Sequence, residues 1–193
     1  MESFDALLEE STRIHGHVCP GQVLGVRMSL LGLKLINVTD PKGRDRKNIY
    51  VFVEIDRCAT DAIQSVTGCS AGKRTLKLID HGVMAATFVN LENDKAVRIT
   101  ALEESRELSK KYCGHILDKR VRQLEAYKIM PDAELFSIQH VEAKIPPEDL
   151  PGRPIKRVQC QGCGDWVQDN RDVVKDGQVL CRRCSGKQYF SLL

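Results

Sequence analysis

The stretch HGHVCPGQ at positions 15–22 places His15, His17 and Cys19 within five residues. Imidazole nitrogen and thiolate sulfur are common zinc ligands. Side chains alternate along an extended segment, so His17 and Cys19 would point to the same side. Pro20 suits the first turn of a helix, and the dipole of that helix would favour the thiolate form of Cys19. The stretch therefore predicts a metal site or a reactive thiol, with His15 either a further ligand or a cap for the preceding helix.

A second cysteine stretch, RCATDAIQSVTGCSAGK, occupies positions 57–73. Cys58 follows an expected strand and precedes an expected helix, which is the same placement as that of Cys19. Cys69 lies in a glycine-rich turn, and three roles stay open for it: metal ligand, disulfide partner of Cys58, or core residue. A Cys–His nucleophile is the weaker alternative, because it also needs an orienting group and an oxyanion pocket. The expected supporting residues are Thr60, Asp61 and Gln64, as hydrogen-bond partners, and Lys73, as a cation that balances bound negative charge.

The C-terminal region contains two Cys-x2-Cys pairs separated by 17 residues, formed by Cys160, Cys163, Cys181 and Cys184. Four thiolates in this spacing predict a structural zinc ion, with iron or a redox dithiol pair as the alternatives. A domain of this size buries too little apolar surface to fold alone, so the metal would supply the missing stability. Gly162 and Gly164 fit knuckle turns that need an unusual φ.

Hydrophobic periodicity predicts an α+β fold with an antiparallel or mixed sheet packed against helices, followed by a small four-cysteine zinc ribbon. Gly16 is placed to end a first helix whose apolar face includes Ile14, and a second helix starts at Pro20. A short helix at 60–66 would be capped by Thr60 or Asp61. A later helical region breaks at Gly114, and a polar turn at 92–94 predicts a hairpin. The expected strands lie near 49–55, 76–82, 85–91, 96–102 and 134–143.

Four of the seven prolines fall within IPPEDLPGRP at 145–154, which predicts an extended connector. We therefore expect a core domain at 1–145, a linker at 146–157 and a zinc-binding domain at 158–193. Gly25, Ser29 and Gly32 form a strip of small residues on the second helix, where another backbone can approach closely. This strip favours a homodimer.

The charge is moderate, with a formal net charge of +3. Residues 151–193 carry eight Lys/Arg against four Asp/Glu, but a zinc tetrathiolate carries two negative charges and halves this excess. Nucleic-acid binding is therefore allowed but not favoured.

The acidic N-terminus lacks a signal-peptide pattern, and no run approaches the ~18 apolar residues of a membrane span. We expect a cytoplasmic protein, in which cysteine clusters indicate metal or redox chemistry.

The combination of HGHVCPGQVLGVRM, a strand that leads to a cysteine, a TDAIQ helix and GCSAGK resembles the FmdE family, which is named after a component of formylmethanofuran dehydrogenase. The C-terminal four-cysteine module resembles the longer members of that family. The resemblance covers essentially the whole chain and implies an α+β core, often dimeric, with a treble-clef-like zinc module. It also implies a core site of His17, Cys19 and Cys58 that holds Zn²⁺ or another divalent transition metal.

Three functions fit these features. The first is an accessory protein or subunit linked to molybdenum- or tungsten-dependent or C1 redox metabolism, with an oxidoreductase partner. The second is a stand-alone metal- or thiol-dependent enzyme. The third is a nucleic-acid-binding regulator that uses the basic ribbon.

Overall fold

A computed structural model describes residues 2–191 of the chain. The chain divides into two compact units, Met1–Lys144 and Ile145–Leu193, which are described separately below. The first unit combines helices with a five-stranded mixed sheet, and the second contains two small antiparallel hairpins. The predicted α+β fold is thus confirmed. Among the described residues, no helix is both long and apolar enough to cross a membrane.

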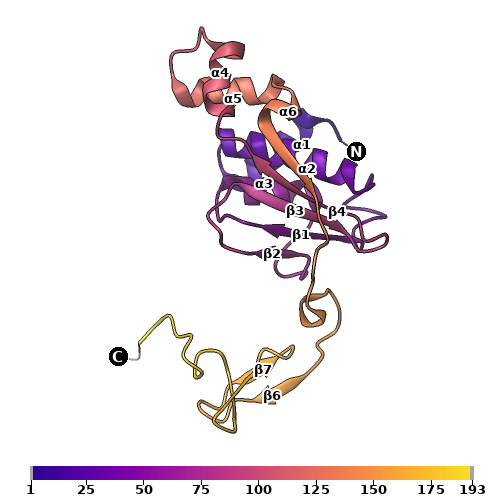
Figure 1. Cartoon of the computed structure of the whole chain (residues 1–193), viewed down its shortest axis with the longest axis vertical. Helices are drawn as coiled ribbons and strands as arrows, with labels where there is room; N and C mark the ends of the chain where they lie inside the picture. The colour runs from indigo at the N-terminus through magenta and orange to yellow at the C-terminus, as the bar shows by residue number, and fades with distance from the viewer. Residues whose placement is uncertain (1, 192–193) are drawn as a thin grey trace. The chain divides into compact units, whose positions relative to one another are not determined.

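The described part of the first unit contains six helices and five strands (Figure 1). Its helices are α1 (Phe4–His15), α2 (Pro20–Leu35), α3 (Cys58–Thr67), α4 (Ser105–Cys113), α5 (Lys119–Ile129) and α6 (Asp132–Leu135). Its strands are β1 (Ile49–Val53), β2 (Leu76–Leu78), β3 (Ala85–Asn90), β4 (Ala96–Ala101) and β5 (Phe136–His140).

The sheet has the strand order β2-β1-β3-β4-β5. β1 and β2 are parallel, with Val51 opposite Leu76, and α3 forms the connection between them. The other three pairs are antiparallel, and the β3–β4 pair confirms the predicted hairpin. This topology places α3 directly after β1, so that the helix begins near the carboxyl end of that strand.

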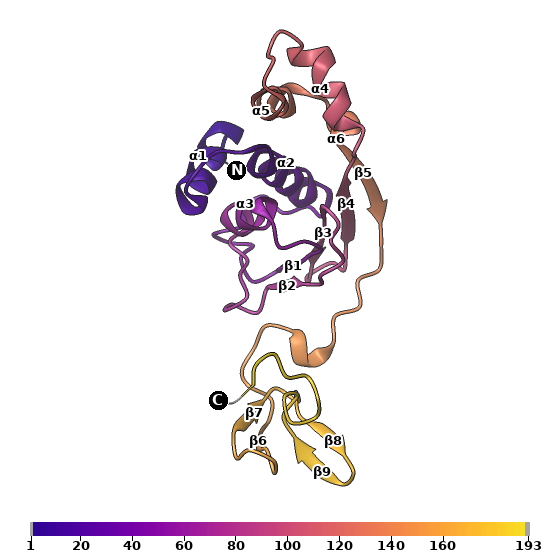
Figure 2. The same cartoon turned by 90° about the vertical axis from the view of Figure 1, so that its left-hand side faces the viewer.

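Helices α1, α2 and α3 lie on one face of the sheet (Figure 2). The core between these layers includes Leu33 and Phe88, both fully buried. Gly32 lets α2 approach β3 closely, because a Cβ there would lie 2.4 Å from the Phe88 ring. Burial of each such large apolar side chain stabilises the fold by roughly 1.5–3 kcal/mol. The packing fixes the positions of α2 and α3 relative to each other and to the sheet.

Two local predictions were wrong. Helix α3 begins at Cys58, with Arg57 as its N-cap, rather than being capped by Thr60 or Asp61. The Thr60 hydroxyl instead donates to the Ile55 carbonyl oxygen at 2.6 Å, and this bond ties the first turn of the helix to the preceding loop. Ile14 is 61% exposed and does not join the apolar face of α1. It lies in the last turn of the helix, two residues before the Gly16 cap.

The strip of small residues on α2 packs within the chain. A Cβ on Gly25 would lie 2.6 Å from both the Ala59 carbonyl oxygen and the Ala62 Cβ of α3, and Gly32 contacts Phe88. Ser29 is fully buried and donates its hydroxyl to the Gly25 carbonyl oxygen at 2.7 Å. The strip therefore gives no argument for a second copy, and the homodimer stays a prediction without that support.

The second unit begins with a short 3₁₀ helix and continues with two hairpins. Its elements are η1 (Pro147–Asp149), β6 (Arg157–Gln159), β7 (Trp166–Gln168), β8 (Val173–Lys175) and β9 (Gln178–Leu180). Part of the predicted linker is bonded to these hairpins: the Ile155 amide donates to Asp169, and Lys156 forms an ion pair with Asp172. The proline-rich segment therefore clusters with the second unit.

Candidate metal centre

The turn between α1 and α2 gathers His15, His17 and Cys19. Gly16 ends α1 with φ 94°, and its amide donates to the Thr12 carbonyl oxygen at 2.8 Å. Cys19 is the extended N-cap residue of α2 and is only 4% exposed. One ligand atom from each of the three side chains lies within 4.8 Å of the other two. The tight turn, in which the positive φ at position 16 favours glycine, thus brings two imidazoles and a thiol close enough to share one metal ion.

Asp61 fixes the orientation of His15. The His15 Nδ1 lies 2.7 Å from Asp61 Oδ2, and only 14% of the histidine side chain is exposed. A carboxylate at this distance accepts the Nδ1 proton, which leaves Nε2 with its lone pair. The Nε2 atom is buried and has no hydrogen-bond partner among residues 2–191. This is the arrangement that metal-ligating histidines adopt, with the second ring nitrogen bonded to a carboxylate.

Cys58 lies beside Cys19, on the other side of Gly21. A Cβ at Gly21 would lie 3.0 Å from Cys58 Cβ and 3.7 Å from Cys19 Sγ, so no side chain separates the two cysteines. Burial, and then the neighbouring Cys19 thiol, raise the pKa of Cys58. Cys58 is not part of the group whose ligand atoms all lie within 4.8 Å. It therefore borders the centre and is not one of its three grouped ligands.

A buried polar network supports this corner of the fold. Ser11 and Gln22 are fully buried, and the Ser11 hydroxyl donates to Gln22 Oε1. The Gln22 amide in turn donates to the Cys58 carbonyl oxygen at 2.5 Å. These bonds join α1, α2 and the start of α3 around the centre. Sequence reasoning missed both residues, although Gln22 is a polar position within the otherwise apolar start of α2.

The other predicted site residues lie elsewhere. Cys69 follows the C-terminal end of α3, whereas Cys58 begins that helix, and ten helical residues span about 15 Å. The Cys69 thiol is buried and donates to the Ile49 carbonyl oxygen at 3.7 Å. The Lys73 ammonium donates to the Gly68 carbonyl oxygen at 2.9 Å and so caps the same end of the helix. Thr60 bonds the loop backbone as described, and Gln64 lies half-buried in the middle of α3.

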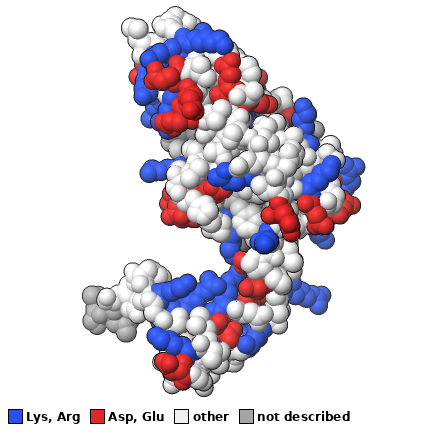
Figure 3. Space-filling model, in the orientation of Figure 1, with Lys and Arg blue, Asp and Glu red and all other residues white. Residues whose placement is uncertain are grey.

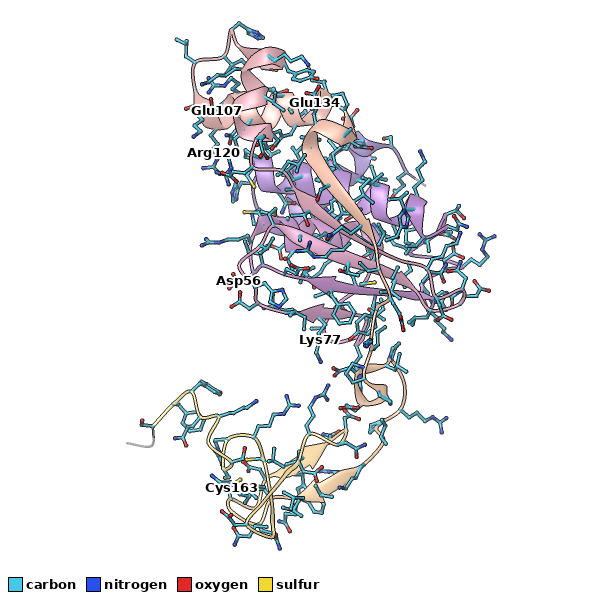
Figure 4. The ribbon with its side chains drawn as sticks, viewed as in Figure 1. Asp56, Lys77, Glu107, Arg120, Glu134 and Cys163 are labelled. Atoms are coloured by element: carbon cyan, nitrogen blue, oxygen red, sulfur yellow. The ribbon has the colours of Figure 1, made fainter. Side chains whose placement is uncertain are left out.

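The donor set suits a borderline-soft divalent ion. Two imidazoles and one thiolate, with a second thiol adjacent, are typical of Zn²⁺ sites. His17 and Val18 are exposed, so the centre is open to solvent on that side. Asp56 is exposed in the loop that leads to Cys58 (Figure 4). The residues present therefore fit a metal centre with three protein ligands and room for a further one.

The four cysteines of the second unit form a separate cluster (Figure 4, which labels Cys163). Their sulfur atoms all lie within 4.8 Å of one another. The Cys181 amide donates to Cys160 Sγ at 3.1 Å, and this bond lowers the pKa of Cys160 to about 6. The Cys184 amide likewise donates to Cys181 Sγ at 3.4 Å. Backbone amides thus favour the thiolate form at Cys160 and Cys181, whereas the neighbouring Cys181 and Cys163 thiols raise the pKa of Cys184. The four-cysteine cluster is compatible with a zinc ribbon.

The two glycines of the first knuckle have different roles. Gly164 has φ 80°, as predicted. Gly162 does not have a positive φ, so that part of the prediction was wrong. A Cβ on Gly162 would instead lie 3.3 Å from the Cβ and Sγ of Cys184. A side chain at position 162 would therefore be tight against Cys184.

Comparison with known families gives a match over most of the first unit. Residues 14–142 match the family described as "FmdE, Molybdenum formylmethanofuran dehydrogenase operon". The chain belongs to the FmdE family. The family resemblance inferred from the motifs is confirmed, and the matched range includes His15, His17, Cys19 and Cys58.

Two further comparisons cover both units of the FmdE protein. A protein from Archaeoglobus fulgidus named "Probable S-adenosyl-L-methionine-binding protein" is 31% identical over 201 residues, which cover 95% of this chain and 53% of the relative. The chain thus spans about half the length of that curated relative. A crystal structure of a tungsten formylmethanofuran dehydrogenase FmdE-like protein from Syntrophus aciditrophicus has a TM-score of 0.65 and 21% identity, and the match covers 98% of this chain and 96% of that one. The fold of the whole chain is therefore shared with a solved structure.

Proposed function

We propose that this FmdE-family protein binds a divalent transition metal, zinc by preference, at a core centre formed by His15, His17 and Cys19, with the Cys58 thiol beside the centre but not among its ligands. The observation that carries the proposal is the buried His15 Nε2, which has no partner in the described part of the chain while Nδ1 is held by Asp61. An uncompensated buried polar atom is costly. A metal ion within reach of Nε2 would remove that cost and account for the carboxylate behind the ring.

Each residue has a distinct task in this centre. His15 donates from Nε2 and is held in position by Asp61, while Cys19 donates its sulfur at the start of α2. His17 donates from the solvent side. When bound, the ion supplies a Lewis acid with a coordination position open to an external ligand. Such an open position separates a ligand-binding or catalytic centre from a closed structural one.

The second unit has a structural role in this proposal. Four cysteines and the amide groups that donate to them would hold a zinc ion without an open position. The ion would replace the hydrophobic core that a unit of this size lacks. We propose zinc for this site as well, in a protein that works in the reducing cytoplasm.

Replacement of zinc by Co²⁺ tests the core centre directly, because bound cobalt absorbs visible light according to its ligands. We expect azide to shift the visible spectrum of the Co²⁺ form of the full chain, since the anion enters the open position. The same titration of His15→Ala should leave the spectrum unchanged, because only the closed four-cysteine site remains. An azide response of equal size in both proteins would refute the assignment of the core centre.

We further propose that the protein acts as an accessory protein or subunit in molybdenum- or tungsten-linked or C1 redox metabolism. The support is the family description and the name of the solved structure. Affinity purification of the tagged chain from its own cells should recover an oxidoreductase partner. Recovery of the chain without one would favour the stand-alone metal- or thiol-dependent enzyme.

The nucleic-acid alternative has less support. Lys and Arg side chains gather along one side of the second unit (Figure 3). However, Lys156, Arg171 and Arg183 form ion pairs with acidic side chains of the same unit. Arg157 stacks on the ring of Trp166 at 4.9 Å and so covers one face of the chain's single tryptophan, which would otherwise be free for base stacking.

A further inference from the structure

The starts of α2 and α3 are packed against each other through backbone and small side chains. At Gly25 a Cβ would lie 2.6 Å from the Ala59 carbonyl oxygen and 2.9 Å from Ala59 Cα. At Gly21 a Cβ would already lie 3.0 Å from Cys58 Cβ. The close approach of the two helices leaves Cys19 and Cys58 as direct neighbours on either side of Gly21.

The two cysteines differ in accessibility. Cys58 is half-buried and so within reach of a small reagent, whereas Cys19 is only 4% exposed. Both are free thiols in the structure. This is the arrangement of an attacking thiol followed by a resolving thiol in disulfide exchange.

The remaining cysteines of the first unit cannot take either role. Cys69 lies at the far end of α3 with its thiol directed to the Ile49 carbonyl oxygen. Cys113 is buried at the end of α4. Cys19 is therefore the partner within reach of Cys58.

We propose that Cys19 and Cys58 are a redox-sensitive pair, which low-molecular-weight disulfides convert to an intramolecular disulfide and which thereby controls metal loading of the core centre. This inference rests on the proposed metal centre and names its regulation. Cys19 within a disulfide has no thiolate to donate, so the centre would lose a ligand on oxidation. Reduction of the bridge would restore it.

The exchange balances without any further oxidant. The Cys58 thiolate attacks one sulfur of the small disulfide, the S–S bond of the reagent breaks, and one small thiolate leaves with the electron pair. The Cys19 thiolate then attacks the Cys58 sulfur of the mixed disulfide and displaces the second small thiolate. The proton of the Cys58 thiol ends on the first released small thiol. Cys19 is a thiolate in the metal-bound form and has no proton to give, so the second small thiolate takes its proton from water. One disulfide is consumed and one is formed, while the metal ion leaves with its charge unchanged.

The test uses the full chain, loaded with zinc and incubated without oxygen in mixtures of glutathione and glutathione disulfide. Alkylation and peptide mass spectrometry identify bridged cysteines, and a chromogenic chelator measures released zinc. We expect a Cys19–Cys58 bridge that forms together with the loss of about one zinc per chain. Cys58→Ser should form no bridge and retain its core zinc, and the matched control Cys69→Ser should behave like the wild type.

Failure of this inference differs from failure of the proposed function. If core zinc is bound and Cys19 and Cys58 both remain alkylatable under conditions that oxidise free thiols, the redox pair is refuted and the metal centre stands. If the reduced protein carries no core zinc but the bridge forms, the metal centre is refuted, and with it the control of metal loading. If Cys58→Ser loses as much zinc as the wild type, the disulfide does not regulate metal loading, and that part of the proposal is refuted.

Discussion

Asp61→Asn offers a sharp test of the core centre, because it replaces one oxygen of the carboxylate that holds His15. The carboxylate accepts from Nδ1 at 2.7 Å and so keeps Nε2 free to donate to a metal. Asparagine has nearly the same shape but can offer an amide N–H to Nδ1, which favours the wrong tautomer. Loss of such a supporting carboxylate typically lowers metal affinity by about 10–100-fold.

The expected loss corresponds to about 1.4–2.8 kcal/mol of metal-binding free energy. The effect on folding of the metal-free protein should be small. Asp61 is 44% exposed, and an ion pair at such a site contributes only about 0–1 kcal/mol. Asp61→Asn should therefore lower metal affinity while the metal-free protein keeps nearly the folding stability of the wild type.

Competition for zinc with a chromogenic chelator measures the affinity, and urea denaturation of the metal-free protein measures stability. Asp56→Asn is the matched control, since it removes the same charge from an exposed acid near Cys58. We expect the control to bind zinc like the wild type. If Asp61→Asn also binds like the wild type while His15→Ala loses the metal, the orienting role of the carboxylate is refuted.

Other parts of the structure give three more predictions. Cys160→Ser should remove the metal of the second unit and leave Ile145–Leu193 open to limited proteolysis, while residues 1–144 resist; equal resistance of both units would argue against structural zinc. Gly25→Ala should destabilise the fold by about 1–3 kcal/mol in urea, because the added methyl overlaps α3, whereas Gly72→Ala meets nothing within 4 Å and should be neutral. Arg98 hydrogen bonds lower the pKa of Glu54, so this pair stabilises the fold above the ordinary glutamate pKa of 4.5 and the contribution is lost as pH falls through the lowered folded value. Glu54→Gln should thus flatten the acid-denaturation curve below that pH, and an unchanged curve would contradict the assignment.

Much of the first unit could be predicted from local patterns. The strands at 49–55 and 85–91 have β-branched and aromatic runs, and Gly16 ends α1 as its position suggests. Cys19 lies at a helix start because Pro20 follows it. These features depend on neighbours in sequence, so a single sequence contains the information for them.

The features that were missed depend on packing between distant segments. His15 meets Asp61 across 46 positions, and no periodicity links the two residues. Cys69 lies only 11 positions after Cys58 in the sequence, but the length of α3 carries it away from the centre. The small residues of α2 were assigned to a second copy because nothing in one sequence shows that Ala59 and Phe88 occupy that face.

The central claim is that the chain carries two metal ions, one in each unit. Inductively coupled plasma mass spectrometry of the purified wild type and of a Cys19→Ala, Cys58→Ala double variant tests it most directly. We predict about two metals per chain in the wild type and about one in the variant, which keeps the four-cysteine site. One metal per chain in both proteins would contradict the account and leave HGHVCPGQ as a thiol site or a turn between two helices.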